Sequence, residues 1–164
     1  MPQPLRWILG WLASAAVITA LATLVQTQVV IGMLPDVAPT LGAEPAPVPV
    51  DAGERLDQSG YDLFRLGSLY GLFILAATLV AWLAAEGVAR FAPVRLRWVA
   101  FVVAGAVAML VMLFFMRMAF FNVDILAGAR DAVGKGLQAL AGATGGYLMA
   151  RLTRRRRRSR YAVD

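Results

Sequence analysis

The sequence predicts an all-α integral membrane protein, folded as an antiparallel four-helix transmembrane bundle with both termini in the cytoplasm. Of the 164 residues, 60% are hydrophobic and only 16% are charged, and the mean hydropathy is +0.67. Long uncharged runs separate the charged residues, and most basic residues fall on one side of the helices that these runs predict. Because average soluble domains are about 45–50% apolar, one small core would not bury this excess, whereas a bilayer would.

The first span is expected at 7–31, within an uncharged run that extends from Trp7 to Pro35. Charges delimit the run, because a charge near the bilayer centre costs roughly 2.5–3.5 kcal/mol. A cleavable signal peptide is the alternative, since Arg6 precedes the run. The run exceeds the roughly 7–15 apolar residues of a signal core, and its small residues at 13–15 come too early to end it. We therefore expect a retained anchor.

Residues 32–60 are expected to form a periplasmic loop, because they hold most of the prolines and are mainly acidic. The stretch Pro45–Pro49 alternates proline with other residues, which favours an extended, polyproline-like backbone. Two roles are open for it: a solvated external loop, or a docking strand for another subunit. Asp57 or Ser59 is expected to cap the helix that follows.

Two more spans and two short connections follow. Uncharged runs at 66–85 and 98–116 each supply about the 20 residues that a spanning helix needs. Pro93 interrupts the basic connection between them, so these spans are expected to form an antiparallel hairpin. The predicted elements are a second span at 63–87, a cytoplasmic basic loop at 88–97, a third span at 98–121 and a short periplasmic loop at 122–131.

A fourth span is expected at 133–152, followed by a cytoplasmic Arg-rich tail at 153–164. Its uncharged run is short and rich in glycine, so it is long enough only if the Lys135 side chain extends to the interface. With four spans, the tail joins Arg6 and the 88–97 loop on the cytoplasmic side, and most acidic residues fall outside. This distribution satisfies the positive-inside rule, and all four tryptophans then lie toward the cytoplasmic face.

Small residues at four-residue spacing predict where the helices pack, because helices in lipid associate where small side chains let backbones approach. The longest such ridge is on the fourth span, which is also the least hydrophobic and is therefore expected to be the most enclosed by protein. The residues expected at helix contacts are Gly134, Gln138, Gly142 and Gly146 on the fourth span and Ala100, Ala104 and Ala108 on the third.

Arg117 is the strongest candidate for a functional residue, because it lies about one turn inside the third span, where ionisable residues are commonly functional. A polar cluster near the external face could hold an anionic headgroup, a quinone carbonyl or a partner's carboxylate. The expected members of this cluster are Arg117, Gln26, Gln28, Asp62 and Asp124. The structural alternative is that Arg117 reaches the interface, or pairs with Asp62 or Asp124 to hold the helices together.

Other charged residues are expected to be structural or to bind lipid. The ion pairs Glu86–Arg90 and Asp62–Arg65 are at helical spacing and are expected to stabilise the second helix. A run of arginines after the fourth span is expected to bind anionic lipid and to anchor the topology. No aromatic residue is interleaved with it to stack bases, so nucleic acid is not an expected partner. The run consists of Arg154, Arg155, Arg156, Arg157 and Arg158.

The composition excludes most familiar catalytic chemistry. Cys and His are absent, which removes disulfides, thiolate or imidazole metal ligands and serine–histidine catalysis. No paired carboxylates lie within a span to act as acid and base. The stretch Gly128–Gly136 departs from a phosphate-binding loop in its spacing and in the residue that follows Lys135. We therefore expect no catalytic residue, no metal and no cofactor.

Three short motifs carry a resemblance to other proteins: Gln26–Gln28 at the end of the first span, Leu66–Tyr70 at the start of the second and Gly145–Leu152 at the end of the fourth. On these motifs the chain resembles a family of small, uncharacterised bacterial inner-membrane proteins with four predicted spans. The resemblance implies the bacterial inner membrane as the location and brings no known activity. Arginine far outnumbers lysine, which is typical of GC-rich bacterial genomes.

These observations predict a non-catalytic accessory or assembly subunit of a larger bacterial membrane complex, or a homo-oligomeric scaffold. The small-residue helix faces would supply packing within lipid, and the acidic loop would contact other membrane subunits. The alternative is a small transporter or ion-conducting oligomer, in which Arg117 and Gln26–Gln28 line the path. A lipid-modifying enzyme without histidine is a third possibility, which the lack of acid and base groups disfavours.

Overall fold

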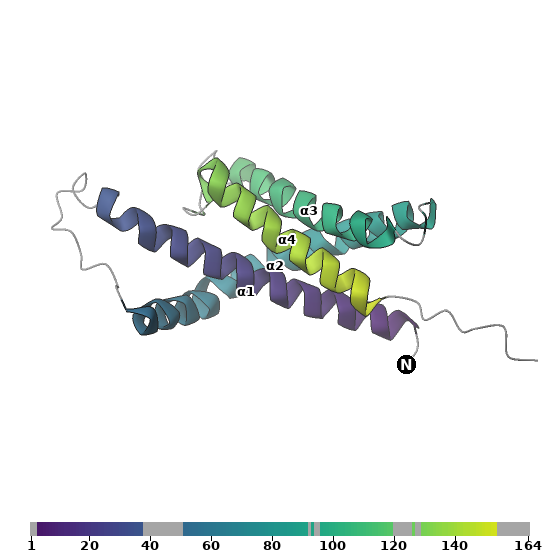
Figure 1. Ribbon diagram of the computed structural model, residues 1–164, viewed down its shortest axis with the longest axis horizontal. Coiled ribbons are helices and arrows are strands. Elements are labelled where there is room, and N and C mark those ends of the chain that lie inside the picture. Colours follow the sequence, from purple (N-terminus) through teal and green to yellow (C-terminus); the bar gives the residue numbers. More distant parts are fainter. Residues whose placement is uncertain are drawn as a thin grey trace, which may run out of the picture.

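The computed structural model describes residues 3–37, 51–91, 96–119 and 129–153, together with Pro93 and Leu126. Within these residues the regular structure is helical and contains no β-strand. It consists of α1 (Gln3–Val37), α2 (Ala52–Phe91), α3 (Arg97–Ala119) and α4 (Ala132–Leu152) (Figure 1). Three segments are long and apolar enough to cross a membrane, namely Gln3–Met33, Gly67–Phe91 and Arg97–Ala119. The predicted all-helical class is confirmed, and the apolar helices indicate a membrane protein.

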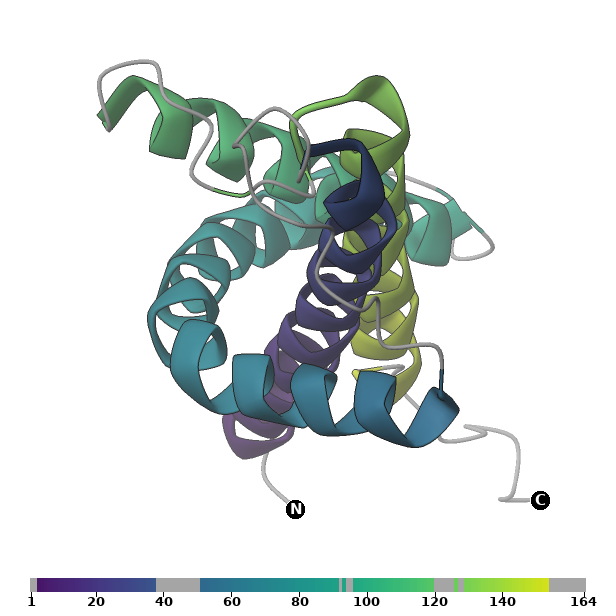
Figure 2. The same cartoon turned by 90° about the vertical axis from the view of Figure 1, so that its left-hand side faces the viewer.

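The four helices pack around a common core. Each packs mainly against two others, in the cyclic order α1, α2, α3, α4 and back to α1. α1 and α4 lie side by side, and the most extensive contact is between α3 and α4 (Figure 1). α2 is curved, so its N-terminal part runs in a different direction from its C-terminal part (Figure 2).

The helices extend into both ends of the predicted 32–60 loop. α1 continues to Val37, and α2 begins at Ala52, before the expected caps Asp57 and Ser59. The early start of α2 has a local cause: Asp51 precedes the helix, Glu54 lies in its first turn, and the Arg55 N–H donates to the Asp51 carbonyl at 3.2 Å. An acidic residue followed three positions later by Glu is typical of a helix N-terminus. Residues 38–50 of the predicted loop lie outside the described residues.

The predicted caps therefore fall inside α2. Asp57 and Ser59 are both helical, and the Ser59 hydroxyl donates to the Arg55 carbonyl at 2.7 Å, one turn back along the same helix. The connection to α3 is shorter than the predicted 88–97 loop, because α2 runs to Phe91 and α3 starts at Arg97. Pro93 lies in that connection, where proline cannot continue the helix, and its carbonyl accepts from the Leu96 N–H at 2.8 Å.

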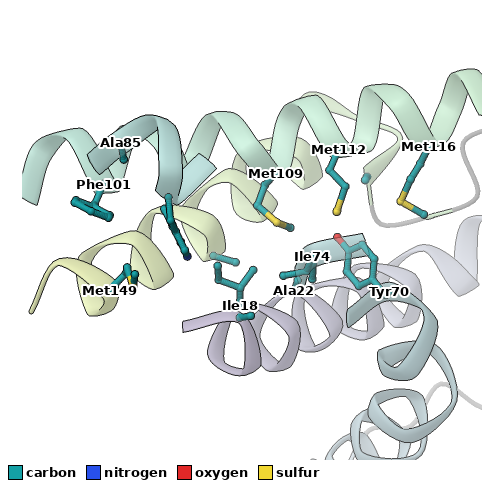
Figure 3. Packing of buried hydrophobic residues seen from close by; sticks show 14 of the residues in the cluster. Ile18, Ala22, Tyr70, Ile74, Ala85, Phe101, Met109, Met112, Met116 and Met149 are labelled. Carbon is teal, nitrogen blue, oxygen red and sulfur yellow. The ribbon is translucent and has the colours of Figure 1, made fainter. Parts of the chain in front are cut away.

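Apolar side chains from all four helices fill the core (Figure 3). Three methionines of α3 point toward the interior along one line, opposite Ile74 and Tyr70 of α2 (Figure 3). Flexible thioether chains of this kind fill irregular gaps between helices. The largest fully buried side chains are those of Trp82, Phe101, Ile18, Ile74, Met109 and Met149.

The outer faces of the helices are apolar as well. Val80 and Leu83 of α2, Phe114 and Phe115 of α3 and Leu140 of α4 are all more than half exposed. Large apolar side chains are thus exposed on three of the helices, two of which contain segments apolar enough to cross a membrane. A lipid environment accounts for this exposure, because lipid chains solvate such side chains.

Candidate functional site

The closest helix contact joins the backbones of α3 and α4. Gly105 of α3 lies against Gly142 of α4, and an added Cβ on either glycine would overlap the carbonyl oxygen of the other. One turn further along, an added Cβ on Gly146 would overlap the carbonyl of Phe101. A Cβ on Gly145 would overlap the side chain of Ile18, so α1 closes on α4 from another side. Only glycine, which has no side chain, lets the helices lie this close together at these positions.

The structure places the predicted packing residues as follows. Gly134, Gln138, Gly142 and Gly146 of α4 are all buried. On α3, Ala108 is buried whereas Ala100 and Ala104 are half-buried. The buried face of α3 contains Gly105, which the alanine spacing did not single out; its signal was that it is the single glycine of α3. That face comprises Phe101, Gly105, Ala108, Met109, Met112 and Met116.

Gln138 links three helices from the centre of the core. Its side chain is fully buried, and its Nε2 donates to the Ala22 carbonyl of α1 at 3.0 Å. Its Oε1 accepts from the Tyr70 hydroxyl of α2 at 3.1 Å. Both ends of a buried amide are thus satisfied, as low dielectric surroundings require. The sequence predicted Gln138 only as a member of the small-residue ridge, and its role as a polar bridge was missed.

Two tryptophans make similar bridges between α1 and α2. The Trp82 indole N–H donates to the Ser14 hydroxyl at 3.2 Å, and the Trp11 indole N–H donates to the Thr78 hydroxyl at 3.1 Å. Trp82 is fully buried and its ring lies 5.9 Å from that of Phe101. Trp82 is therefore a core residue.

Arginines hold the C-terminal end of α4 at one end of the molecule. Arg97 forms an ion pair with Glu86 at 2.7 Å and donates to the Thr153 carbonyl at 3.2 Å. Arg6 donates to the Leu152 carbonyl at 2.6 Å. These guanidinium groups satisfy carbonyls that have no partner within the helix, next to the negative end of its dipole. Glu86 thus pairs with Arg97 of the next helix instead of the predicted Arg90.

We expect Arg97→Gln to lower the free energy of unfolding by about 1 kcal/mol, because a half-buried, charge-assisted contact between three helices is lost. The matched control is Arg90→Gln, which removes the same charge from an exposed position on α2. Thermal unfolding in neutral detergent at two salt concentrations measures both variants. Equal losses in the two variants would show that the Arg97 contacts contribute nothing beyond net charge.

The predicted polar cluster is divided between two places. Gln28 bonds to Ser59 at 3.3 Å and accepts from Arg55 at 3.4 Å, while Asp62 accepts from the Thr27 hydroxyl at 2.8 Å. These contacts join α1 to the N-terminal part of α2. Arg117 instead lines a cavity between the end of α3 and the start of α4.

The remaining predicted members have different positions. Gln26 is buried on α1. Arg65, the expected partner of Asp62, lies over the Tyr61 ring at 5.3 Å from its centroid. Asp124 and the run Arg154 to Arg158 lie outside the described residues. Within the part of the chain that the structure describes, no group of three His, Cys, Asp or Glu side chains could hold a metal ion.

The chain was compared with known proteins. No family model, no curated protein and no solved structure matches it. The resemblance to small four-span bacterial membrane proteins therefore stays a prediction from the sequence.

Proposed function

We propose that the protein is a non-catalytic accessory or scaffold subunit of a larger bacterial inner-membrane complex, with four transmembrane helices. The observation that carries the proposal is the way α4 is held: glycine-mediated backbone contact with α3 and the Gln138 bridge to α1 and α2. A unit packed so closely is suited to present fixed outer surfaces to partner subunits rather than to undergo a catalytic cycle.

The packing supports α4 as a fourth span, although α4 is not among the three segments that are long and apolar enough to cross a membrane by composition. Its most polar residues lie where a span can hold them: Gln138 is buried in the core, and Lys135 and Arg151 lie toward the two ends of the helix. Its outward side chains include Val133, Leu137 and Leu140, which are suited to lipid. Because α4 lies along α3, an apolar helix long enough to cross, the same bilayer would enclose both.

The distribution of charge supports cytoplasmic termini. Contacts of Arg6 and Arg97 bring the start of α1, the start of α3 and the end of α4 to one end of the molecule. Arg90 and Arg151 lie near the same helix ends, and Glu86 is the acidic residue there among those described. The positive-inside rule assigns such a basic end to the cytoplasm.

A groove between α1 and α2 supports a role in assembly. Its volume is about 420 Å³, and it lies within the apolar segments of both helices. Small side chains line much of it, which lets a second backbone approach closely, so its proposed occupant is a transmembrane helix of a partner subunit. The small lining residues are Ala15, Ala16, Thr19, Gly67, Ser68 and Gly71.

Purification in mild detergent tests this proposal. The native chain is expected to migrate with a partner subunit or as a homo-oligomer. Ala16→Leu and Ser68→Leu fill the groove from exposed positions and are expected to abolish this association while leaving the fold intact. Ala76→Leu, exposed on α2 but outside the groove, is the matched control. A native chain that migrates alone, or variants that associate as well as the control, would contradict the proposal.

A further inference from the structure

The cavity that Arg117 lines lies where α3 ends and α4 begins. Its volume is about 270 Å³. Among the described residues of its wall, the charged side chains are those of Arg117 and Lys135, and both are basic. The other lining residues are apolar: Leu110, Leu113, Phe114, Met116, Leu126 and Ala129. The described part of the wall thus combines two cations with apolar side chains.

The chemistry of these two cations favours an anion. Lys135 belongs to the first turn of α4, where the helix dipole is positive. The nearby Asp131 carboxylate is engaged as the helix cap and accepts from the Gly134 N–H at 2.8 Å. Arg117 has five N–H donors, so it can bind an additional anion beside any other partner. Apolar walls reduce screening and strengthen the attraction.

The position of the cavity favours an amphiphile. Leu110 and Phe114 line it and are also 42% and 60% exposed on the outer face of α3, so a ligand chain can continue along that face. A volume of about 270 Å³ is slightly below the roughly 300–1,000 Å³ typical of pockets that enclose a whole small molecule. It has room for a headgroup and the first part of one chain.

We propose that this cavity binds the anionic headgroup of a membrane amphiphile, a phosphate or a carboxylate, through Arg117 and Lys135, with the alkyl chain along Leu110 and Phe114. The inference rests on the proposed membrane location of α3 and α4, but not on the presence of a partner subunit. Phospholipids and fatty acids share this headgroup chemistry, and the experiment distinguishes them.

Calorimetric titration of the full chain in a neutral maltoside detergent tests the site with dodecyl phosphate, dodecanoate, dodecyltrimethylammonium and inorganic phosphate. At least one anionic amphiphile is expected to bind, and the cationic one is not. Arg117→Gln combined with Lys135→Gln is expected to weaken binding at least about tenfold. Lys135→Gln alone covers the case in which the double variant does not fold. Arg130→Gln, at an exposed position outside the cavity, is the matched control and is expected to bind normally.

The outcomes of the titration distinguish a phospholipid from a fatty acid as the source of the anionic headgroup. Binding of dodecyl phosphate alone identifies a phospholipid, binding of dodecanoate alone identifies a fatty acid, and binding of both supports a general anionic amphiphile site. Absence of binding, equal binding of the cationic amphiphile, equal binding of inorganic phosphate, or affinity unchanged by Lys135→Gln and by the double variant would overturn the proposal. None of these results depends on whether the chain oligomerises.

Discussion

Replacing Gly142 with Leu is expected to prevent the stable association of α3 with α4. Any side chain at this position enters the carbonyl of Gly105 and the side chain of Met109. Overpacking of a tight core typically costs about 1–3 kcal/mol and occasionally more, and here a backbone rather than a flexible side chain is in the way. We expect Gly142→Leu to give little folded protein, and Gly142→Ala to lose about 1–3 kcal/mol.

Gly136, also on α4, offers a control whose substitution is expected to change stability in the opposite direction. An added Cβ on Gly136 meets no atom within 4 Å. Gly136→Ala should therefore be neutral or should stabilise α4 by about 0.5–1 kcal/mol, because alanine favours the helix over glycine. Thermal unfolding in detergent and the yield of folded protein measure both changes. If Gly142→Ala were as stable as Gly136→Ala, the close α3–α4 contact would be wrong.

Replacing Gln138 with Leu is the substitution with the second largest expected effect. It removes the donor to the Ala22 carbonyl and leaves the buried Tyr70 hydroxyl without its acceptor. Hydrogen bonds between membrane helices contribute about 0.6 kcal/mol on average and up to about 1.7 kcal/mol. Since two such bonds break, we expect a loss of about 1–3 kcal/mol in the free energy of unfolding.

A double-mutant cycle with Tyr70→Phe isolates one of the two bonds. The double variant is expected to lose less than the sum of the single losses, because Tyr70→Phe removes the hydroxyl that Gln138→Leu strands. Thr144→Ala is the control, since Thr144 is exposed on the same helix and bonds only to the Leu140 carbonyl among the described residues. Strict additivity in the cycle would show that Tyr70 and Gln138 do not interact in the folded protein.

The sequence was sufficient to predict the helices, because runs without charge are a direct consequence of the cost of burying charge. It was less informative at the helix ends. Asp51 and Glu54 form a local starting signal for α2, but the many prolines before it favoured a longer loop. A tertiary contact also replaced a local one: Glu86 had Arg90 at favourable spacing, yet Arg97 reaches it from the next helix.

The candidate sites show the same division between local and tertiary information. The glycine spacing on α4 is visible in the sequence, whereas its counterpart Gly105 is recognised only once the two helices are side by side. The grouping of Arg117 with Lys135 depends on how the end of α3 meets the start of α4. The sequence alone predicts for Lys135 only that its side chain extends to the interface, because sequence spacing across a turn does not specify which side chains share a cavity.

The central claim is that α4 crosses the membrane together with the three more apolar helices. The chain has no cysteine, so single cysteines can be placed at Glu54, Arg90, Arg130 and Asp164 and treated in intact cells with a membrane-impermeant maleimide. Four spans predict labelling at positions 54 and 130 from outside, and labelling at 90 and 164 only after the membrane is permeabilised. Labelling of positions 130 and 164 from the same side would contradict the account.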